Sequence, residues 1–268
     1  MNYAYYSLSC NPFDKHSLKE SDRFESKDHK EMTSRLNFLK ETRGIGVFTA
    51  VPGMGKSFAL RCFGKSINPQ QYQMQYICLS TIAVSEFYKE FCDCLNLDKT
   101  GGKPGMFKAI QERIYHLYKE KRRPLILAID EAQHLNPDIL RDLKMFMNFQ
   151  YDSLNCFTLI LCGEPHLNRN LEKPVHAALR QRITAHYTFA GLDPDETKEY
   201  VFHKLSLAGG SSSIIGEDAV SAVTSLGQGN PRLIDNLMTD ALMLGIQLQK
   251  QVIDADVIMA AANAAALG

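Results

Sequence analysis

The chain has 268 residues, which is enough for one compact domain or for a larger domain with a smaller one beside it. Its 30 lysines and arginines balance 30 aspartates and glutamates, so no net charge attracts the whole molecule to a polyanion. The seven cysteines lack the spacing of a zinc site, and neither a signal peptide nor a membrane-spanning run is visible, which predicts a reduced cytoplasmic protein without a membrane partner.

The first 43 residues are expected to form an extended arm and one helix. Residues 28–42 carry apolar side chains at helical spacing between charged ones, which predicts an amphipathic helix. Four aromatic residues are expected to pack the arm onto the α/β core that follows: Tyr3, Tyr5, Tyr6 and Phe13.

Residues 44–190 contain five short apolar runs, and helical patterns separate them. Unbroken apolar strands that alternate with helices are typical of a parallel sheet with both faces covered. We therefore expect an α/β core built on a five-stranded parallel sheet. The expected strands are Ile45–Ala50, Gln73–Leu79, Pro124–Ile129, Phe157–Cys162 and Thr184–Phe189.

The strand pattern stops near Gly191, and residues 191–268 are expected to form an all-helical second domain. Four helical patterns follow one another with turn residues between them. The expected helices span residues 193–207, 216–226, 230–247 and 254–265.

A phosphate-binding loop is predicted between the first strand and the next helix. Gly55-Lys56-Ser57 completes the second half of the pattern G-x-x-x-x-G-K-[ST], whereas Ala50 stands where the first glycine is usual. Lys56 is expected to neutralise the β- and γ-phosphates of ATP, and Ser57 to ligate Mg²⁺. An ordinary glycine-rich turn is the alternative. The predicted nucleotide contacts are Pro52, Gly53, Met54, Gly55, Lys56, Ser57 and Phe58.

Asp130 and Glu131 follow the apolar run that ends at Ile129. They are predicted to lie at the C-terminal end of a strand, where open α/β sheets bind ligands. We expect Asp130 to hold Mg²⁺ and Glu131 to orient and polarise the attacking water. The alternative is that the two acids only cap a helix. Together with the loop, they predict an enzyme that hydrolyses ATP with Mg²⁺.

Six short motifs occur together along most of the chain: "NPF", "GKS", "LILAIDEAQHL", "LILCGEPHL", "LRQRI" and "GNPRLIDNL". This combination resembles AAA+ ATPases of the ExeA type, the group that also contains the transposition helpers TniB and TnsC. The resemblance implies a P-loop AAA+ core with a C-terminal helical lid. It also implies a homo-oligomer, either a ring or a helical filament.

The resemblance assigns roles to four more side chains. Glu164 lies at the tip of the sensor-1 strand, where many relatives carry glutamine, and it is predicted to be a further nucleotide-binding residue. It is expected to help position water, with a place away from the nucleotide as the alternative. Arg180 and Arg182 resemble the arginine finger that reaches the ATP of a neighbouring subunit, with a surface ion pair as the alternative. Arg232 resembles the sensor-2 arginine at the start of a lid helix.

Three functions fit these predictions. The first is a transposition helper that assembles with ATP on duplex DNA, recruits a transposase or target-selector proteins, and hydrolyses ATP slowly until DNA or a partner stimulates it. The sequence ends directly after the expected lid, which favours such a stand-alone helper. The second is an ExeA-type secretion or envelope assembly ATPase that acts on protein partners. The third is an ATP-binding switch with little turnover, which Ala50 and Glu164 leave open.

Binding to duplex DNA is expected to be largely independent of sequence, because no base-reading motif is visible. Basic residues lie around Gly101-Gly102, and a second basic group, Lys119, Lys121, Arg122 and Arg123, precedes the third strand. The alternative for these lysines is a solvated helix face. The predicted DNA contacts are Ser80, Thr81, Lys99, Lys103 and Lys108.

Overall fold

The computed structural model describes residues 3–14, 20–78, 83–151 and 153–266. The chain divides into two compact units. The α/β unit contains Glu31–Pro52 and Lys56–Phe189, and the helical unit contains Met1–Lys30, Gly53–Gly55 and Ala190–Gly268. The first 43 residues thus contribute to both units, and the functional limits of the domains stay a prediction.

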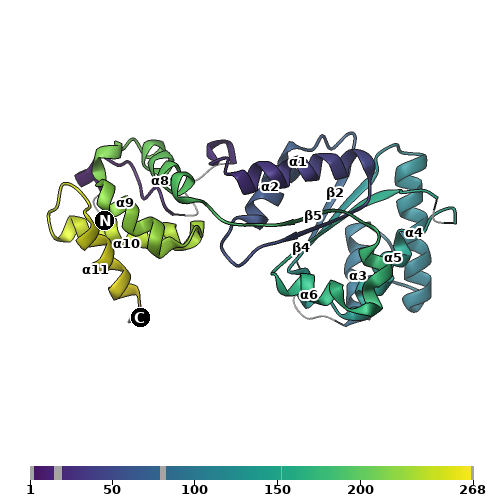
Figure 1. Ribbon diagram of the computed structural model, residues 1–268. Coiled ribbons are helices and arrows are strands. Elements are labelled where there is room, and N and C mark those ends of the chain that lie inside the picture. The colour runs from purple at the N-terminus through teal and green to yellow at the C-terminus, as the bar shows by residue number, and fades with distance from the viewer. Residues whose placement is uncertain (1–2, 15–19, 79–82, 152, 267–268) are drawn as a thin grey trace. The chain divides into compact units, whose positions relative to one another are not determined.

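The α/β unit is built on a parallel sheet, as predicted. Its strand order is β2-β3-β4-β1-β5, and every neighbouring pair is parallel. Residues of β1, β3 and β4 are buried along their whole length, because helices cover both faces of the sheet (Figure 1). The strands are β1 (Ile45–Thr49), β2 (Gln73–Cys78), β3 (Leu125–Asp130), β4 (Phe157–Gly163) and β5 (Ile183–Thr188).

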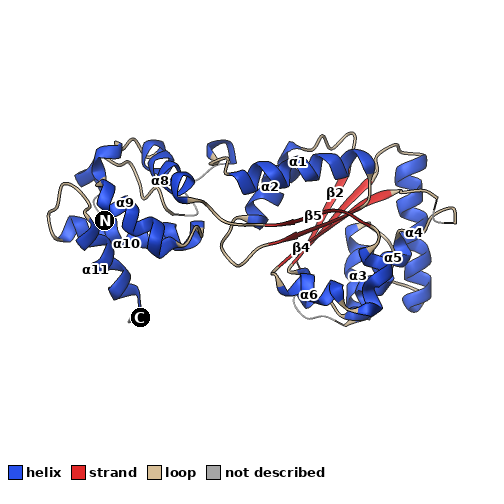
Figure 2. Ribbon diagram, viewed as in Figure 1, coloured by secondary structure: helices blue, strands red, loops and turns tan. Residues whose placement is uncertain are grey.

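The helices of the α/β unit form two layers (Figures 1 and 2). One layer contains α1 (Lys27–Thr42) and α2 (Lys56–Ser66). The other contains α3 (Val84–Cys94), α4 (Gly102–Lys119), α5 (Pro137–Phe146) and α6 (His166–Glu172), and the short α7 (Ala177–Arg180) leads into β5.

Alternate residues of the strands face the two layers, as the pleat requires. Leu125, Leu127 and Ile129 of β3 belong to the large apolar cluster that α3, α4 and α5 complete. On the opposite face, Gly46 of β1 lies so close to Leu39 of α1 that an added Cβ would be 2.3 Å from Leu39 Cδ1. A larger residue at this position would push α1 away from β1.

The helical unit contains the four helices predicted after residue 190 (Figure 2). Tyr6 and Phe13 of the N-terminal arm are buried in the apolar cluster of these helices. The prediction that the arm packs on the α/β core is therefore wrong for these two residues, because the helices leave an apolar surface that the arm covers. The helices are α8 (Pro194–Leu207), α9 (Glu217–Gly227), α10 (Pro231–Gln247) and α11 (Ala255–Ala266).

Several hydrogen bonds fix the arm on the helical unit, and two of them come from long polar side chains. Asn11 Nδ2 donates to Thr239 Oγ1 at 3.1 Å, and the Tyr6 hydroxyl donates to the carbonyl oxygen of Lys250 at 2.8 Å. Among the residues described, no helix is both long and apolar enough to cross a membrane.

Candidate active site

The loop between β1 and α2 has the backbone of an anion-binding turn. Gly53 and Gly55 have φ values of 95° and 88°, which favour glycine, and α2 begins directly afterwards at Lys56. Ala50 is buried, and its N–H donates to the carbonyl oxygen of Gly163 at 3.1 Å. Alanine is therefore accommodated where the usual motif carries glycine.

Lys56, Ser57 and Asp130 come together at the C-terminal ends of β1 and β3. Ser57 Oγ donates to Asp130 Oδ2 at 2.6 Å, across 73 residues of sequence. Lys56 Nζ lies 3.9 Å from Asp130 Oδ1, and both side chains are buried. A hydroxyl and a carboxylate are oxygen ligands of the kind that Mg²⁺ prefers, and the ammonium and backbone N–H groups suit phosphate. These residues thus fit a magnesium nucleotide.

Tyr76 of β2 is a member of this cluster that the sequence did not predict. Its hydroxyl donates to Asp130 Oδ2 at 3.1 Å. Burial raises the pKa of Tyr76, and the Asp130 carboxylate raises it further, so the hydroxyl keeps its proton and stays a donor. Burial, with Asp130 as the next cause, also raises the pKa of the nearby Cys162 thiol, which is therefore neutral.

Glu131 adopts a left-handed backbone conformation, with φ at 54°, and its N–H donates to Asp130 Oδ1 at 3.0 Å. Its carboxylate accepts a hydrogen bond from Gln133 Nε2 at 2.7 Å. The other end of the same amide, Gln133 Oε1, accepts from the backbone N–H of Glu164 at 3.0 Å. Gln133 was not predicted from the sequence, although it lies two residues after Glu131.

Arg180 is engaged within its own chain. Its Nη1 donates to the carbonyl oxygens of Leu171 and Glu172, at 3.3 Å and 2.8 Å, and so satisfies the C-terminal end of α6. Arg182 is half-buried just before β5. Their roles as arginine fingers stay predictions.

Arg232 lies exposed in the first turn of α10, after Pro231. Asn230 caps the helix, because its side-chain oxygen accepts from the N–H of Arg232 at 3.0 Å. Gly53 belongs to the same compact unit, and a Cβ added to it would lie 2.5 Å from Asn230 Oδ1 and 2.8 Å from Arg232 Cβ. The start of α10 therefore lies against the tip of the phosphate-binding loop.

The predicted DNA contacts are less available than the sequence suggested. Lys99 Nζ lies 2.5 Å from an Asp93 oxygen, and Lys108 Nζ lies 3.8 Å from a Glu112 oxygen. Each of these exposed pairs is weak, but a DNA phosphate would have to compete with the carboxylate. Ser80 and Thr81 lie outside the described residues.

Lys103 is more firmly engaged. Its Nζ is 2.6 Å from Asp142 Oδ2 and 5.5 Å from the centre of the Tyr88 ring. In the second basic group, Lys119, Lys121 and Arg122 are exposed, while Arg123 Nε donates to the carbonyl oxygen of Tyr72 at 3.3 Å. The second group is thus the more accessible one.

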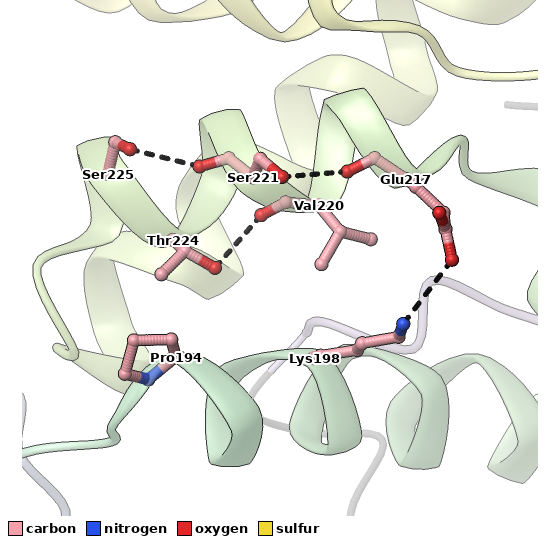
Figure 3. A pocket seen from close by; sticks show the side chains of 7 residues that line it. All are labelled: Pro194, Lys198, Glu217, Val220, Ser221, Thr224 and Ser225. Carbon is pink, nitrogen blue, oxygen red and sulfur yellow. Dashed lines mark hydrogen bonds and ion pairs between the residues drawn. The ribbon is translucent and has the colours of Figure 1, made fainter.

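A pocket between α8 and α9 is lined by seven residues, three of which carry a hydroxyl (Figure 3). Ser221, Thr224 and Ser225 each donate to a carbonyl oxygen four residues earlier in α9. Lys198 Nζ lies 3.6 Å from Glu217 Oε1. The Asp130 cluster remains the stronger candidate site, because it lies beside a glycine loop and a helix start that can bind an anion.

Comparisons with known proteins agree with this geometry. Residues 39–171 match the family model described as AAA domain. General secretion pathway protein A of Aeromonas hydrophila is 29% identical over 249 residues, which are 91% of this chain and 44% of that protein. This chain therefore spans less than half of the length of that relative.

Two solved structures share the fold at low identity. Cdc6p from Pyrobaculum aerophilum has a TM-score of 0.65 at 17% identity, over 90% of this chain and 67% of that chain. The Aeropyrum pernix ORC1 protein in complex with DNA has a TM-score of 0.63 at 13% identity, over 96% of this chain and 69% of that chain. The chain thus shares the fold of these proteins, an α/β core followed by helices, and its residues 39–171 are similar to an AAA domain.

Proposed function

We propose that this chain hydrolyses ATP with Mg²⁺ at the Asp130 cluster. The proposal is carried by the 2.6 Å hydrogen bond between Ser57 and Asp130, with the Lys56 ammonium beside it at the ends of parallel strands. A hydroxyl, a carboxylate and an ammonium that converge behind a glycine loop are the parts that a P-loop ATPase needs.

Each residue has a defined task in the proposed reaction. The N–H groups of the loop and the Lys56 ammonium bind the phosphates, while Ser57 and Asp130 hold Mg²⁺. Bound Mg²⁺ neutralises charge that develops on the phosphate oxygens. Glu131 accepts a hydrogen bond from the attacking water and turns its lone pair toward the γ-phosphorus. Arg232 adds positive charge near the loop.

Oligomerisation would complete the site. A guanidinium from a neighbouring subunit can stabilise charge on the transferred phosphoryl group. Arg180 would have to release the carbonyl oxygens of Leu171 and Glu172 to do so. Arg180 and Arg182 are both candidates for contact in trans, and turnover of isolated subunits should be slow.

For the client, we propose duplex DNA during transposition, with a transposase and target-selector proteins as partners. The six motifs resemble ExeA-type ATPases, a group that also contains TniB and TnsC, and this resemblance supports the proposal. The accessible basic group at residues 119–122 supplies charge for phosphate contacts. ATP-bound subunits would assemble on DNA in the cytoplasm as a ring or filament.

Assembly of a secretion or envelope apparatus is the second candidate. It is favoured by the 29% identity to General secretion pathway protein A over most of this chain. The carboxylate partners of Lys99, Lys103 and Lys108 favour it as well, because they reduce the charge available to DNA. In this case the client would be a protein.

Phosphate release tests the ATPase proposal. We expect wild-type protein to hydrolyse ATP, Glu131→Gln to bind ATP with little turnover, and Lys56→Ala to lose nucleotide binding. His134→Gln is the matched control, because His134 is exposed in the same turn. Equal turnover in wild type, Glu131→Gln and Lys56→Ala would refute the assignment, and ATP binding without wild-type turnover would indicate a switch.

Negative-stain microscopy tests the client. Glu131→Gln protein is mixed with ATP and duplex DNA, and each ligand is also omitted in turn. Rings or filaments that need both ligands and weaken with salt would support the DNA proposal. Monomers under every condition would contradict it, and assemblies indifferent to DNA would favour the protein client.

A further inference from the structure

The side-chain amide of Gln133 connects the ends of two neighbouring strands. Its Nε2 donates to Glu131 Oε2 at 2.7 Å, just after β3. Its Oε1 accepts from the backbone N–H of Glu164 at 3.0 Å, just after β4. One half-buried side chain thus holds both the acid proposed to activate water and the strand tip beside it.

The orientation of this amide is fixed by its partners. A backbone N–H can only donate, so the amide atom facing Glu164 must be the oxygen. The NH₂ group then faces Glu131, whose ionised carboxylate can only accept. In a flipped amide, the NH₂ group would face the N–H of Glu164, and the amide oxygen would face the Glu131 carboxylate. The arrangement is therefore directional, and it matches the charge of Glu131.

The tip of β4 leaves room for Gln133. A Cβ added to Gly163 would lie 2.6 Å from Gln133 Oε1, 3.1 Å from Leu167 Cδ2 and 3.3 Å from Gln133 N. These distances are too short for any larger residue unless Gln133 moves. Glycine at this position thus allows the amide to reach the N–H of Glu164.

Glu131 needs such an anchor. Its backbone has a positive φ, and its flexible side chain has several rotamers of similar energy. Hydrogen bonds to carboxylates are among the stronger ones in proteins, and one such bond is enough to select one rotamer. Because Gln133 is itself held by β4, the selected rotamer is fixed relative to the strand tip.

We propose that Gln133 is a positioning residue that sets the orientation in which Glu131 meets the attacking water. The proposal rests on the proposed function of this site as an ATPase. It adds a directional coupling: a displacement at the tip of β4 moves the Gln133 amide, and with it the carboxylate of Glu131. Glu164 would act in this coupling through its backbone N–H.

Two substitutions of similar size test the proposal in the full chain. Gln133→Met removes both hydrogen bonds and keeps the length of the side chain, whereas Gln133→Glu places an acceptor against the Glu131 carboxylate. We expect kcat to fall about 10- to 100-fold in both variants, as for other misplaced catalytic groups. The Kd for ATP should change by less than about threefold, since Gln133 contacts neither the loop nor Lys56. His134→Gln should retain wild-type kcat.

A double-mutant cycle separates positioning from general damage. If Gln133 acts through Glu131, adding Gln133→Met to Glu131→Gln should change the residual turnover by less than about twofold. An equal loss of kcat in both backgrounds would overturn the proposal, as would wild-type kcat in Gln133→Met. If the wild type hydrolyses ATP and Glu131→Gln does not, the ATPase assignment stands whether or not Gln133 is a positioning residue. If the wild type does not hydrolyse ATP, both proposals are overturned.

Discussion

Each of the two compact units buries one lysine beside an aspartate, and the two pairs differ in what surrounds them. In the helical unit, Lys204 Nζ lies 3.3 Å from Asp235 Oδ1, and the Tyr200 hydroxyl donates to the same oxygen at 2.8 Å. The rings of Phe13 and Tyr200 lie against the ammonium, 5.8 Å and 5.4 Å from it. Aromatic rings and Asp235 therefore enclose the Lys204 ammonium, while the Asp235 side chain stays 17% exposed.

In the α/β unit, Lys56 Nζ is 3.9 Å from Asp130 Oδ1, which is too long for a direct hydrogen bond. The pair lies beside a loop of positive-φ glycines at the ends of strands, where backbone N–H groups can bind an anion. Burial lowers the pKa of Lys204, and Asp235 opposes this shift. The Lys204 ammonium thus contacts its aspartate directly, whereas the Lys56 ammonium stands off from Asp130 beside groups that can bind an anion.

Removal of the enclosed lysine should have the largest effect. Lys204→Met leaves the Asp235 carboxylate without its ammonium among apolar neighbours, which should lower the free energy of unfolding by about 3 kcal/mol. Urea unfolding measures this loss. Adding Asp235→Leu should restore much of the stability, because no buried charge then remains. A loss below about 1 kcal/mol in Lys204→Met would show that the pair is not enclosed as described.

The equivalent change at the Lys56–Asp130 pair should affect binding far more than stability, because Asp130 keeps hydrogen bonds from Ser57, Tyr76 and the N–H of Glu131. Lys56→Met removes the charge that neutralises phosphate, so the Kd for ATP should rise about 100-fold. Isothermal titration with Mg²⁺ and ATP measures this change. Lys204→Met is the control. At a temperature where this variant is folded, its Kd for ATP should equal that of the wild type. Wild-type affinity in Lys56→Met would place the nucleotide elsewhere.

The hydroxyl of Ser57 should matter through the metal. Ser57→Ala removes one oxygen ligand, so the Mg²⁺ concentration for half-maximal ATP turnover should rise about tenfold. Chelation of Mg²⁺ should abolish turnover in both proteins. Titration of MgCl₂ in a phosphate-release assay measures the shift. An unchanged Mg²⁺ requirement in Ser57→Ala would remove Ser57 from the metal site.

The two tyrosines provide the smallest and most closely matched comparison. Tyr200→Phe and Tyr76→Phe each remove one hydroxyl that donates to an aspartate. Tyr200→Phe should cost about 1–2 kcal/mol of stability, because the Asp235 oxygen that loses the donor lies in the enclosed pair. Tyr76 is 50% exposed, so water can replace its hydroxyl and the cost should stay below about 0.5 kcal/mol. Equal losses in thermal unfolding would remove the distinction between the pairs.

The fold could be predicted from the sequence because its signals are local. Unbroken apolar runs such as Ile45–Thr49 mark strands covered on both faces, and Asn230 with Pro231 marks the start of α10. The Lys56, Ser57 and Asp130 cluster was likewise expected, because a loop motif and a strand-end acid are each visible in one short stretch.

The remaining residues depend on contacts between distant segments. Tyr76 reaches Asp130 from the neighbouring strand, across 54 residues, and periodicity alone cannot show this register. Lys204 and Asp235 lie on different helices, and each looks like an ordinary surface charge in the sequence. The arm was assigned to the wrong unit for the same reason, since Phe13 alone does not reveal which apolar surface it covers.

The thermal stabilisation of three proteins by Mg²⁺ and ATP tests the difference between the two pairs most directly. At ATP concentrations near 100 times Kd, ligand binding should raise the Tm of wild type by about 5 °C or more. We predict that Lys204→Met has a lower Tm without ligand but the same upward shift, and that Lys56→Met has a normal Tm and almost no shift. A full shift in Lys56→Met, or none in folded Lys204→Met, would contradict the account.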